Sequence, residues 1–554
     1  MSSFKQKTSW HEWAARMAAV LVGVSALVWF LVRVIPKPAR ASYPCQRAAF
    51  PIASAFVLWL CSLSGLFTAA LPKRIVRRHP RLLAGTLVLM VAATGGWLYH
   101  SQHAQAAGRT TSWNFAPQHR NEPLGIARGV YPGRVVWARD PKAAHWSGDL
   151  NSTVDQWWMD RNNDQARIDA MMSATLRKLT GARTDEEAWQ KIFTHYNERA
   201  RGMKSRGYGD GEIVAIKINL NNSAASGIGN YTNASPQVTL AMVRQLVLHA
   251  HVPASRIVVY DARRNIYPAM LTKIWTNFKD VRFVQNQEPQ TAQPVNPDYG
   301  DYHGLEQADW VEGVSYSANS YQDAKMIPRQ IKDATYLVNL ALLKAHSYPY
   351  AAAEGGDEGQ TAVTMTGKNH FGSIKGTPEL HAAINTDQEG TPHAYSPIVD
   401  LASSPNLGAK TILYMLDGLY CGRRHQSYPL HFPNPPFNNR VEPYANTDWP
   451  SSLLASFDGV ALDSVGLDIL YSQSQNNVGK DGHPRIMIRE NADDYLQEEA
   501  TPDRAPSGTA YMQAGKPTLS LGVFEHWDSD ATRLYSRNKD PKHGKGIELI
   551  YIPM

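Results

Sequence analysis

The stretch Glu212-Ile-Val-Ala-Ile-Lys-Ile-Asn219 decides the fold of this chain. It is a continuous apolar run interrupted only by Lys217, and such a run predicts a strand buried on both faces of a sheet. After a polar loop, Ser235 and Pro236 are typical of the N-cap and first turn of a helix. A second apolar run follows at residues 256–261. Strand, helix and strand at this spacing predict a parallel βαβ unit.

Further apolar runs extend the pattern, at residues 281–284, 336–343 and 411–416. Alternating helices and strands predict a large mixed α/β domain built on parallel βαβ units. Ligands of open α/β sheets bind beyond the carboxyl ends of the strands. The polar residues near these ends are therefore candidate site residues: Lys217, Asn219, Asp261, Lys344, His346 and Asp417. Exit into polar loops is the ordinary alternative, but Lys217 lies inside its run, where a lysine requires a partner or a function.

A second polar group lies in Thr364-Met-Thr-Gly-Lys-Asn-His-Phe-Gly-Ser373. Lys368 can neutralise a phosphate or carboxylate, and Asn369 and His370 can form hydrogen bonds with it. Gly367 and Gly372 allow close approach of the backbone. We therefore expect this segment to bind an anion together with Lys344 and His346. The expected binding residues within the segment are Thr366, Gly367, Lys368 and Asn369.

Familiar ligand-binding motifs are incomplete or missing. Gly367-Lys368 does not form a phosphate loop, because Asn369 stands where Ser or Thr should hold magnesium. The chain has no Gly-x-Ser-x-Gly elbow and no His-Glu-x-x-His helix. His346 and His370 could also ligate a metal, but no spacing rule supports it. Any metal or cofactor therefore stays unknown.

The composition bounds the class of protein. The chain has 554 residues, of which 43% are hydrophobic and 19% charged, so we expect packed domains rather than disorder. The net charge of +7 is partly due to a basic run at residues 73–81, which lies between two apolar segments. Such a run is typical of a membrane topology signal. Without a zinc-finger or RNA-binding signature, we expect no nucleic-acid partner.

The first hundred residues predict a module of three transmembrane helices. Apolar stretches run over about residues 17–35, 50–71 and 82–99, each near the roughly 20 residues that cross a bilayer. A cleaved signal peptide explains only the first of them, and a buried helical hairpin is the alternative for all three. The basic run favours a cytoplasmic loop. We therefore expect a multi-pass membrane protein, with its large C-terminal domain outside the cytoplasm.

The predicted domains are a membrane module at 1–100, a polar linker at 101–124 and an α/β domain at 125–554. The chain has three cysteines, Cys45, Cys61 and Cys421, and no Cys-x-x-Cys pair. One chain therefore cannot supply a tetrathiolate iron–sulfur or zinc site. We expect Cys421 to be a small apolar filler.

Several segments of the large domain resemble the bacterial family numbered 362 among the domains of unknown function. Its most specific patterns here are Lys368-Asn-His-Phe-Gly372 and Asp458-Gly-Val-Ala-Leu-Asp463, with Gly459 where proline is expected. The chain is similar to the stand-alone, membrane-anchored variant, which lacks ferredoxin cysteines. The resemblance therefore implies no iron–sulfur cluster, and it implies no settled activity. The other matching segments are 133–137, 216–220, 339–346 and 416–418.

Three aspartates near residue 460 have different predicted roles. Asp458 is well placed as a helix N-cap. Asp463 and Asp468 are five residues apart, roughly 140° around a helix, so they do not form a paired-carboxylate site. Asp463 could face Lys217 or Lys368, either in a site or in a structural ion pair.

Two classes of function remain open. The first is a membrane-anchored enzyme acting on an anionic small molecule or an envelope glycan. In it the lysines would bind the anion, His346 or His370 would transfer a proton, and Asp261, Asp417 or Asp463 would orient the histidine. The second is a non-catalytic binding or assembly protein of the cell envelope. The tryptophans allow either core packing or sugar stacking; they are Trp137, Trp146, Trp157, Trp158 and Trp527.

Overall fold

The structure is a computed structural model. It describes residues 115–150, 152–221, 227–318, 320–346, 363–377, 380, 394–422, 427–438, 441–443, 448–475, 486, 488 and 492–554, with Val24, Ser25 and Val28. Apart from these last three residues, the predicted membrane spans lie outside the described residues. Within the described part, no helix is long and apolar enough to span a bilayer. The membrane module therefore stays a prediction.

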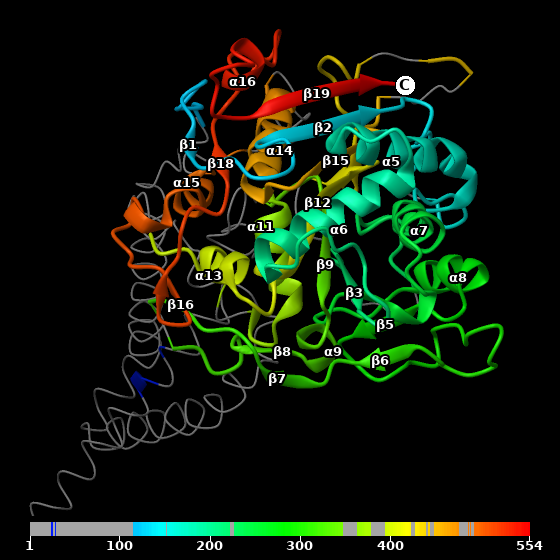
Figure 1. Ribbon diagram of the computed structural model, residues 1–554. Helices are drawn as coiled ribbons and strands as arrows, with labels where there is room; N and C mark the ends of the chain where they lie inside the picture. The colour runs from blue at the N-terminus through cyan, green and yellow to red at the C-terminus, as the bar shows by residue number, and fades with distance from the viewer. Residues whose placement is uncertain are drawn as a thin grey trace, which may run out of the picture. The chain divides into compact units, whose positions relative to one another are not determined.

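A nine-stranded sheet forms the centre of the described domain (Figure 1). Its strand order is β19-β2-β15-β12-β9-β3-β4-β5-β6. β15 runs antiparallel to both of its neighbours, and every other adjacent pair is parallel. The predicted mixed α/β domain is therefore confirmed. The strands are β2 (Arg134–Arg139), β3 (Val214–Ile218), β4 (Ile257–Tyr260), β5 (Arg282–Gln285), β6 (Leu305–Gln307), β9 (Tyr336–Leu342), β12 (Thr411–Gly418), β15 (Ser452–Ser456) and β19 (Glu548–Pro553).

The predicted βαβ unit consists of β3, α7 (Pro236–Arg244) and β4. β3 and β4 pair in parallel, with Val214 opposite Ile257. α7 begins where the sequence predicts, because the Ser235 hydroxyl accepts hydrogen bonds from the backbone N–H groups of Gln237 and Val238, both at 3.2 Å. This unit places the end of β3 beside the end of β4.

Helices cover both faces of the sheet (Figure 1). On one face, apolar side chains of β2, β3, β4 and β9 pack against α5 (Gln165–Thr180), α6 (Asp185–Arg201), α7 and α8 (Pro268–Asn277). On the other face lie α11 (Thr366–Asn369), α13 (Pro397–Ser403), α14 (Gly459–Ser474) and α15 (Asp494–Ala500). Residues alternate between the two faces along a strand. Lys217 and Asn339 therefore point toward α11, because neighbouring Ala215 and Leu337 belong to the core on that side.

Shorter elements join these layers. Two-stranded ladders are β1 (Leu124–Gly125) with β18 (Val523–Phe524), β7 (Trp310–Glu312) with β8 (Met326–Pro328), β10 (Lys344–Ala345) with β11 (Val363–Thr364), β13 (Cys421–Gly422) with β14 (Pro429–Leu430) and β16 (Met512–Gln513) with β17 (Lys516–Pro517). The remaining helices are α9 (Arg329–Lys332), α16 (Ser536–Lys539), the π turn η3 (Gln245–His249) and the 3-10 turns η2 (Asp160–Asn162), η4 (Ala254–Arg256), η5 (His370–Ser373), η6 (Gly408–Lys410) and η7 (Pro502–Arg504).

The N-terminal part of the described chain packs against its C-terminal part. Phe115 is buried, and Asn121 donates its backbone N–H to the carbonyl of His526 at 2.9 Å. Ordered contacts therefore begin within the segment that we predicted as a linker, whose exact bounds stay a prediction.

Candidate functional site

The side chain of Lys217 forms the centre of a buried polar cluster at the end of β3. Its ammonium donates to Asp261 and to Asn369, each at 3.1 Å, and to the carbonyl of Ile218 at 2.5 Å. Burial lowers the pKa of Lys217, and Asp261 offsets part of this effect. Asp261 also accepts the backbone N–H groups of Leu220 and Arg263. Lys217 therefore forms a buried ion pair with Asp261.

Gly372 makes this ion pair possible. A Cβ atom at this position would lie 2.5 Å from Lys217 Nζ and 2.8 Å from an Asp261 oxygen, so any side chain would displace one of them. The carbonyl of Gly372 also accepts the backbone N–H of Ala262 at 2.8 Å. The glycine that ends the Lys368–Gly372 pattern is therefore required for close approach to β3 and β4.

Asn369 connects α11 to two strands. Its amide donates to Asn339 Oδ1 at 2.7 Å, and its oxygen accepts from Lys217. Asn219 Nδ2 lies 3.4 Å from the same oxygen. Asn219 Oδ1 is buried and has no hydrogen-bond partner within the described part of the chain. A buried amide oxygen in this state can accept a hydrogen bond from a ligand or from water.

Lys344 lies next to this cluster and is only 1% exposed. Its ammonium donates to Asn221 Oδ1 at 2.8 Å. Burial lowers the pKa of Lys344 to about 7, the nearby thiol of Cys421 raises it slightly, and the Arg264 guanidinium lowers it. No carboxylate among the described residues forms an ion pair with Lys344. Cys421 itself is buried, and burial raises the pKa of its thiol to about 12, as suits an inert filler.

Lys368 and His346 form a second pair, and His346 follows Lys344 by two residues in the chain. Lys368 Nζ lies 3.3 Å from each ring nitrogen of His346, and both side chains are buried. The two side chains are therefore within hydrogen-bonding distance of each other.

His370 contacts Ser373 and Asn339 rather than Lys344 or Lys368. Its Nδ1 is 3.2 Å from the Ser373 hydroxyl and its Nε2 is 3.5 Å from Asn339 Nδ2. Burial and then the charge of Lys217 lower its pKa to about 3. His370 is therefore neutral at physiological pH.

Asp463 caps the short helix α11. Its carboxylate accepts the backbone N–H groups of Thr366 and Gly367 at 3.0 and 2.9 Å, and the Thr366 hydroxyl at 2.7 Å. Burial raises the pKa of Asp463 to about 6. Its contacts are with α11 and Tyr495 rather than with Lys217 or Lys368. Thr366 and Gly367 are therefore held by the protein itself.

Asp417 and Asp458 also act as caps. Asp417 accepts the backbone N–H of Ser235, the N-cap of α7, at 2.8 Å, and burial raises its pKa to about 6. Asp458 accepts the N–H of Ala461 at 3.0 Å, as the predicted N-cap of α14. Asp463 and Asp468 face different neighbours, because Asp468 contacts His526. Asp463 and Asp468 therefore do not form a carboxylate pair.

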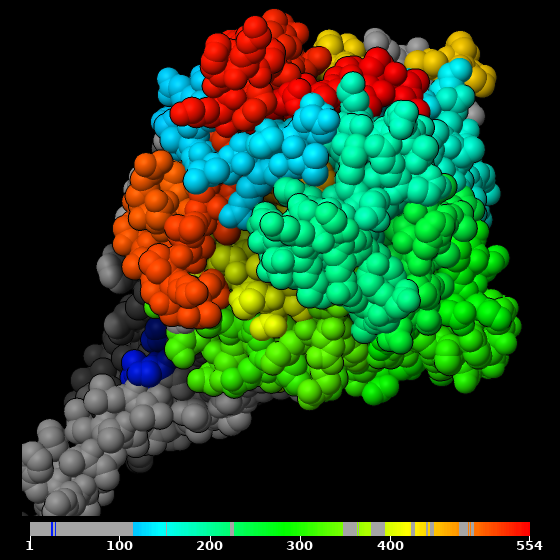
Figure 2. Space-filling model, in the orientation of Figure 1, coloured from blue at the N-terminus to red at the C-terminus, as the bar shows by residue number. Residues whose placement is uncertain are grey.

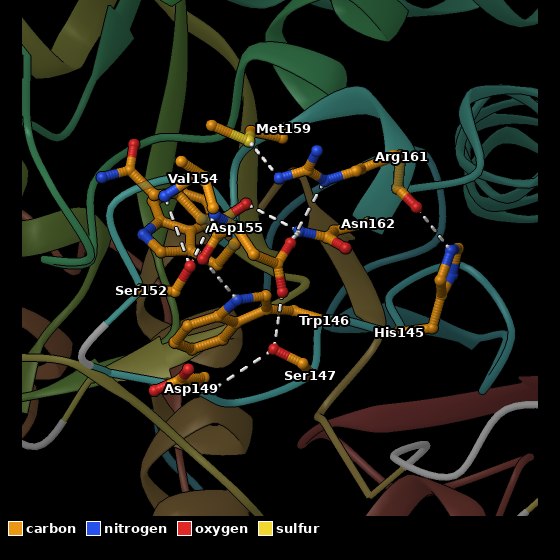
Figure 3. A network of polar contacts seen from close by, with 12 residues as sticks. His145, Trp146, Ser147, Asp149, Ser152, Val154, Asp155, Met159, Arg161 and Asn162 are labelled. Carbon is orange, nitrogen blue, oxygen red and sulfur yellow. Dashed lines mark hydrogen bonds and ion pairs between the residues drawn. The ribbon is translucent and has the colours of Figure 1, made fainter.

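Four of the tryptophans singled out in the sequence pack inside the domain. Trp137, Trp146, Trp157 and Trp527 are at most 1% exposed. In Figure 3, the Asp155 carboxylate accepts hydrogen bonds from Ser147, Arg161 and Asn162, while the Trp146 ring N–H reaches the Asp155 carbonyl. These contacts stabilise the loop that contains Trp146 and Trp157. Of the two interpretations offered by the sequence, the structure supports core packing for these four.

The structure places most of the predicted residues in three contact groups: Lys217 with Asp261, Asn219 and Asn369, Lys344 with Asn221, and Lys368 with His346. The chain links these groups, because Asn219 and Asn221, Lys344 and His346, and Lys368 and Asn369 are close in the sequence. We define the lysine site as Lys217, Asn219, Asn221, Asp261, Lys344, His346, Lys368 and Asn369. Thr366, Gly367, His370, Asp417 and Asp463 lie near it but are held by other contacts. Asn339 was not predicted as a site residue, although it lies in a segment that the sequence singles out. Gly372 was predicted to allow close backbone approach, and it does so beside Lys217 and Asp261. Within the described residues, no group of three or more His, Cys, Asp or Glu side chains could hold a metal ion.

One comparison with known proteins gave a match. Residues 214–468 match the model of a family described as "Domain of unknown function (DUF362)". This range includes every residue of the lysine site. No curated protein and no solved structure matched the chain.

Proposed function

This chain belongs to the DUF362 family, and from that premise we propose that its α/β domain binds an anionic small molecule or polymer at the lysine site. The proposal rests on the buried ammonium of Lys344, which has no carboxylate partner among the described residues. A buried ammonium is costly without a counter-ion, and among the described residues its one hydrogen bond is to the neutral amide of Asn221. A bound phosphate or carboxylate would supply the missing negative charge.

The charges around Lys344 support an anion rather than a cation. Arg264 adds positive charge nearby, whereas Asp261 is already bonded to Lys217 and to two backbone N–H groups. The free oxygen of Asn219 could accept a hydrogen bond from a hydroxyl of the same ligand. A phosphate-bearing or carboxylate-bearing glycan or cofactor has both kinds of group.

The proposal also includes the location of the protein in the cell. The apolar N-terminal stretches and the basic run support anchoring in the bacterial inner membrane, with the lysine site outside the cytoplasm. An envelope glycan would then be accessible to the site. A reporter fused after Met554 that is active only in the cytoplasm would contradict this orientation.

The contacts favour binding over catalysis. Asp417 and Asp463 are committed to capping, and His370 is neutral and bonded to Ser373 and Asn339. His346, 3.3 Å from Lys368, is the histidine placed for acid–base chemistry in the lysine site. An enzyme would therefore lose turnover in His346→Ala and retain it in His370→Ala, whereas a binding protein shows no turnover to lose.

Lys344→Gln tests the proposal directly. We expect the variant to bind sulfate about 10- to 100-fold more weakly than the wild type, because a hydrogen bond to a charged group contributes roughly 1.5–3 kcal/mol. Isothermal titration calorimetry on the full chain measures the effect. Lys204→Gln, at an exposed position, is the matched control. Equal affinities of wild type and Lys344→Gln would exclude Lys344 as an anion ligand.

The affinity for sulfate should also depend on pH. Burial lowers the pKa of Lys344 to about 7, so the ammonium is present below this pH and is lost above it. A bound anion favours the charged form, so the decline begins somewhat above pH 7. Sulfate keeps its charge throughout this range. We expect affinity to fall between pH 7 and about pH 9 in the wild type, and a shallower profile in Lys344→Gln. An equally steep profile in the variant would assign the titration to another group.

A further inference from the structure

A separate cavity of about 240 Å³ lies on the α11 side of the sheet. Its walls come from the end of α6, the start of α14, the η6 segment and the chain after β17. Figure 2 shows its mouth, where the teal end of α6, the yellow segment around η6 and the orange segment around residues 510–520 meet. Residues distant in the sequence therefore line one cavity that is open to solvent at its mouth.

Two arginines line this cavity without a carboxylate partner. Neither Arg128 nor Arg199 forms an ion pair with a described residue. Burial lowers the pKa of Arg128, and the positive charge of Arg199 lowers it further. Asp458 offsets part of this cost, but its carboxylate already accepts three backbone N–H groups. Two guanidinium groups that repel each other across a cavity favour an anion between them.

The N-terminus of α14 adds a second positive element. Gly459 and Val460, the first two residues of this 16-residue helix, line the cavity. The Asp458 side chain caps the N–H of Ala461, and neither of the first two N–H groups has a hydrogen-bond partner within the described chain. A helix N-terminus of this kind attracts anions.

Buried polar side chains without partners also line the cavity. Glu499 is 3% exposed and its carboxyl group forms no hydrogen bond with a described residue. Burial raises its pKa well above the ordinary value, and the charges of Asp463 and Asp458 raise it further. This environment favours the protonated carboxyl group, which can donate a hydrogen bond. Thr518 Oγ1 is likewise buried and unpaired within the described part.

We propose that this cavity is a second binding site, for a small organic anion that carries a phosphate or a carboxylate. Arg128, Arg199 and the first N–H groups of α14 bind the anionic group, and Glu499 and Thr518 form hydrogen bonds with the rest of the ligand. The site is distinct from the lysine site. α11 separates the two, because Thr366, Gly367 and His370 line the cavity whereas Asn369 contacts Lys217 and Lys368 contacts His346.

Arg199→Gln in a Lys344→Gln background tests the proposal. Arg199 is exposed and forms no hydrogen bond or ion pair with a described residue, so the substitution should leave the fold intact, which circular dichroism checks. We titrate the full-length protein with sulfate and, separately, with succinate, to distinguish phosphate-like from carboxylate ligands. The parent should bind at least one of them, and Arg199→Gln should weaken this binding by about 10- to 100-fold. Arg183→Gln, whose side chain is 95% exposed, is the control and should have no effect.

Two results would overturn the inference. In one, Lys344→Gln binds neither sulfate nor succinate at millimolar concentrations. In the other, Arg199→Gln and Arg183→Gln bind with the same affinity as their parent. Neither result bears on the lysine site, whose own test is the comparison of Lys344→Gln with the wild type.

Discussion

Replacing Asp468 by asparagine is expected to lower the free energy of unfolding by about 3–5 kcal/mol. Asp468 is fully buried in α14 and accepts hydrogen bonds from His526 Nδ1 at 2.5 Å, from the Trp527 backbone at 2.9 Å and from the Tyr535 hydroxyl at 2.7 Å. The substitution removes the charge that balances a buried imidazolium. It also places an amide where three donors converge.

Urea denaturation of the wild type and the variant measures this loss. Asp309→Asn is the control, because its ion pair with Arg329 is exposed, and such a pair contributes about 1 kcal/mol or less. If the two substitutions cost the same, the buried network does not stabilise the C-terminal segment.

The same network predicts how stability depends on pH. Burial opposes protonation of His526, but Asp468 and Asp493 raise its pKa to about 9, above the ordinary 6.5. The folded state thus binds this proton more tightly than the unfolded state. The resulting stabilisation, roughly 3 kcal/mol, is fully present below pH 6.5 and is lost as pH rises through 9. Asp468→Asn should show a smaller decline over this range.

Asp261→Asn is expected to destabilise the domain by a similar amount, about 3–5 kcal/mol. Asp261 is the carboxylate partner of Lys217, which is fully buried at the centre of the sheet. The variant leaves the ammonium beside a neutral amide. Thermal and urea denaturation at pH 7 measure the effect.

The double variant Lys217→Met, Asp261→Asn provides the control. It removes both charges, so we expect it to be more stable than Asp261→Asn alone, because replacing both members of a buried pair is far less costly than replacing one. A double variant that is less stable than the single variant would show that Lys217 stabilises the fold by packing rather than by its charge.

Local sequence patterns predicted the regular elements well. The run at 212–219 predicted β3, and Ser235-Pro236 predicted the start of α7. Both predictions succeeded because burial on both faces of a sheet and helix capping depend on residues that are close together in the sequence. Asp458 was predicted as an N-cap for the same reason. The spacing of Asp463 and Asp468 also predicted that they face different partners.

Contacts between distant segments were harder to predict. Asp417 lies near the end of a strand, as expected, but α7 begins beside it. The Asp417 carboxylate accepts a hydrogen bond from the backbone N–H of Ser235, the N-cap of α7. Gly372 meets Lys217 across more than 150 residues, which no local pattern shows. Arg128, Arg199 and Glu499 lie in ordinary polar surroundings in the sequence, and only the fold gathers them around one cavity. The parallel pairing of β19 with β2 is equally non-local.

The lysine site is proposed to bind an anion through Lys344. The most direct measurement is a crystal structure of the protein grown in selenate, with the anion located by its anomalous scattering. We predict a selenate oxygen within hydrogen-bonding distance of Lys344 Nζ. An ordered selenate found only elsewhere, with Lys344 paired to a carboxylate of the chain itself, would contradict anion binding through Lys344.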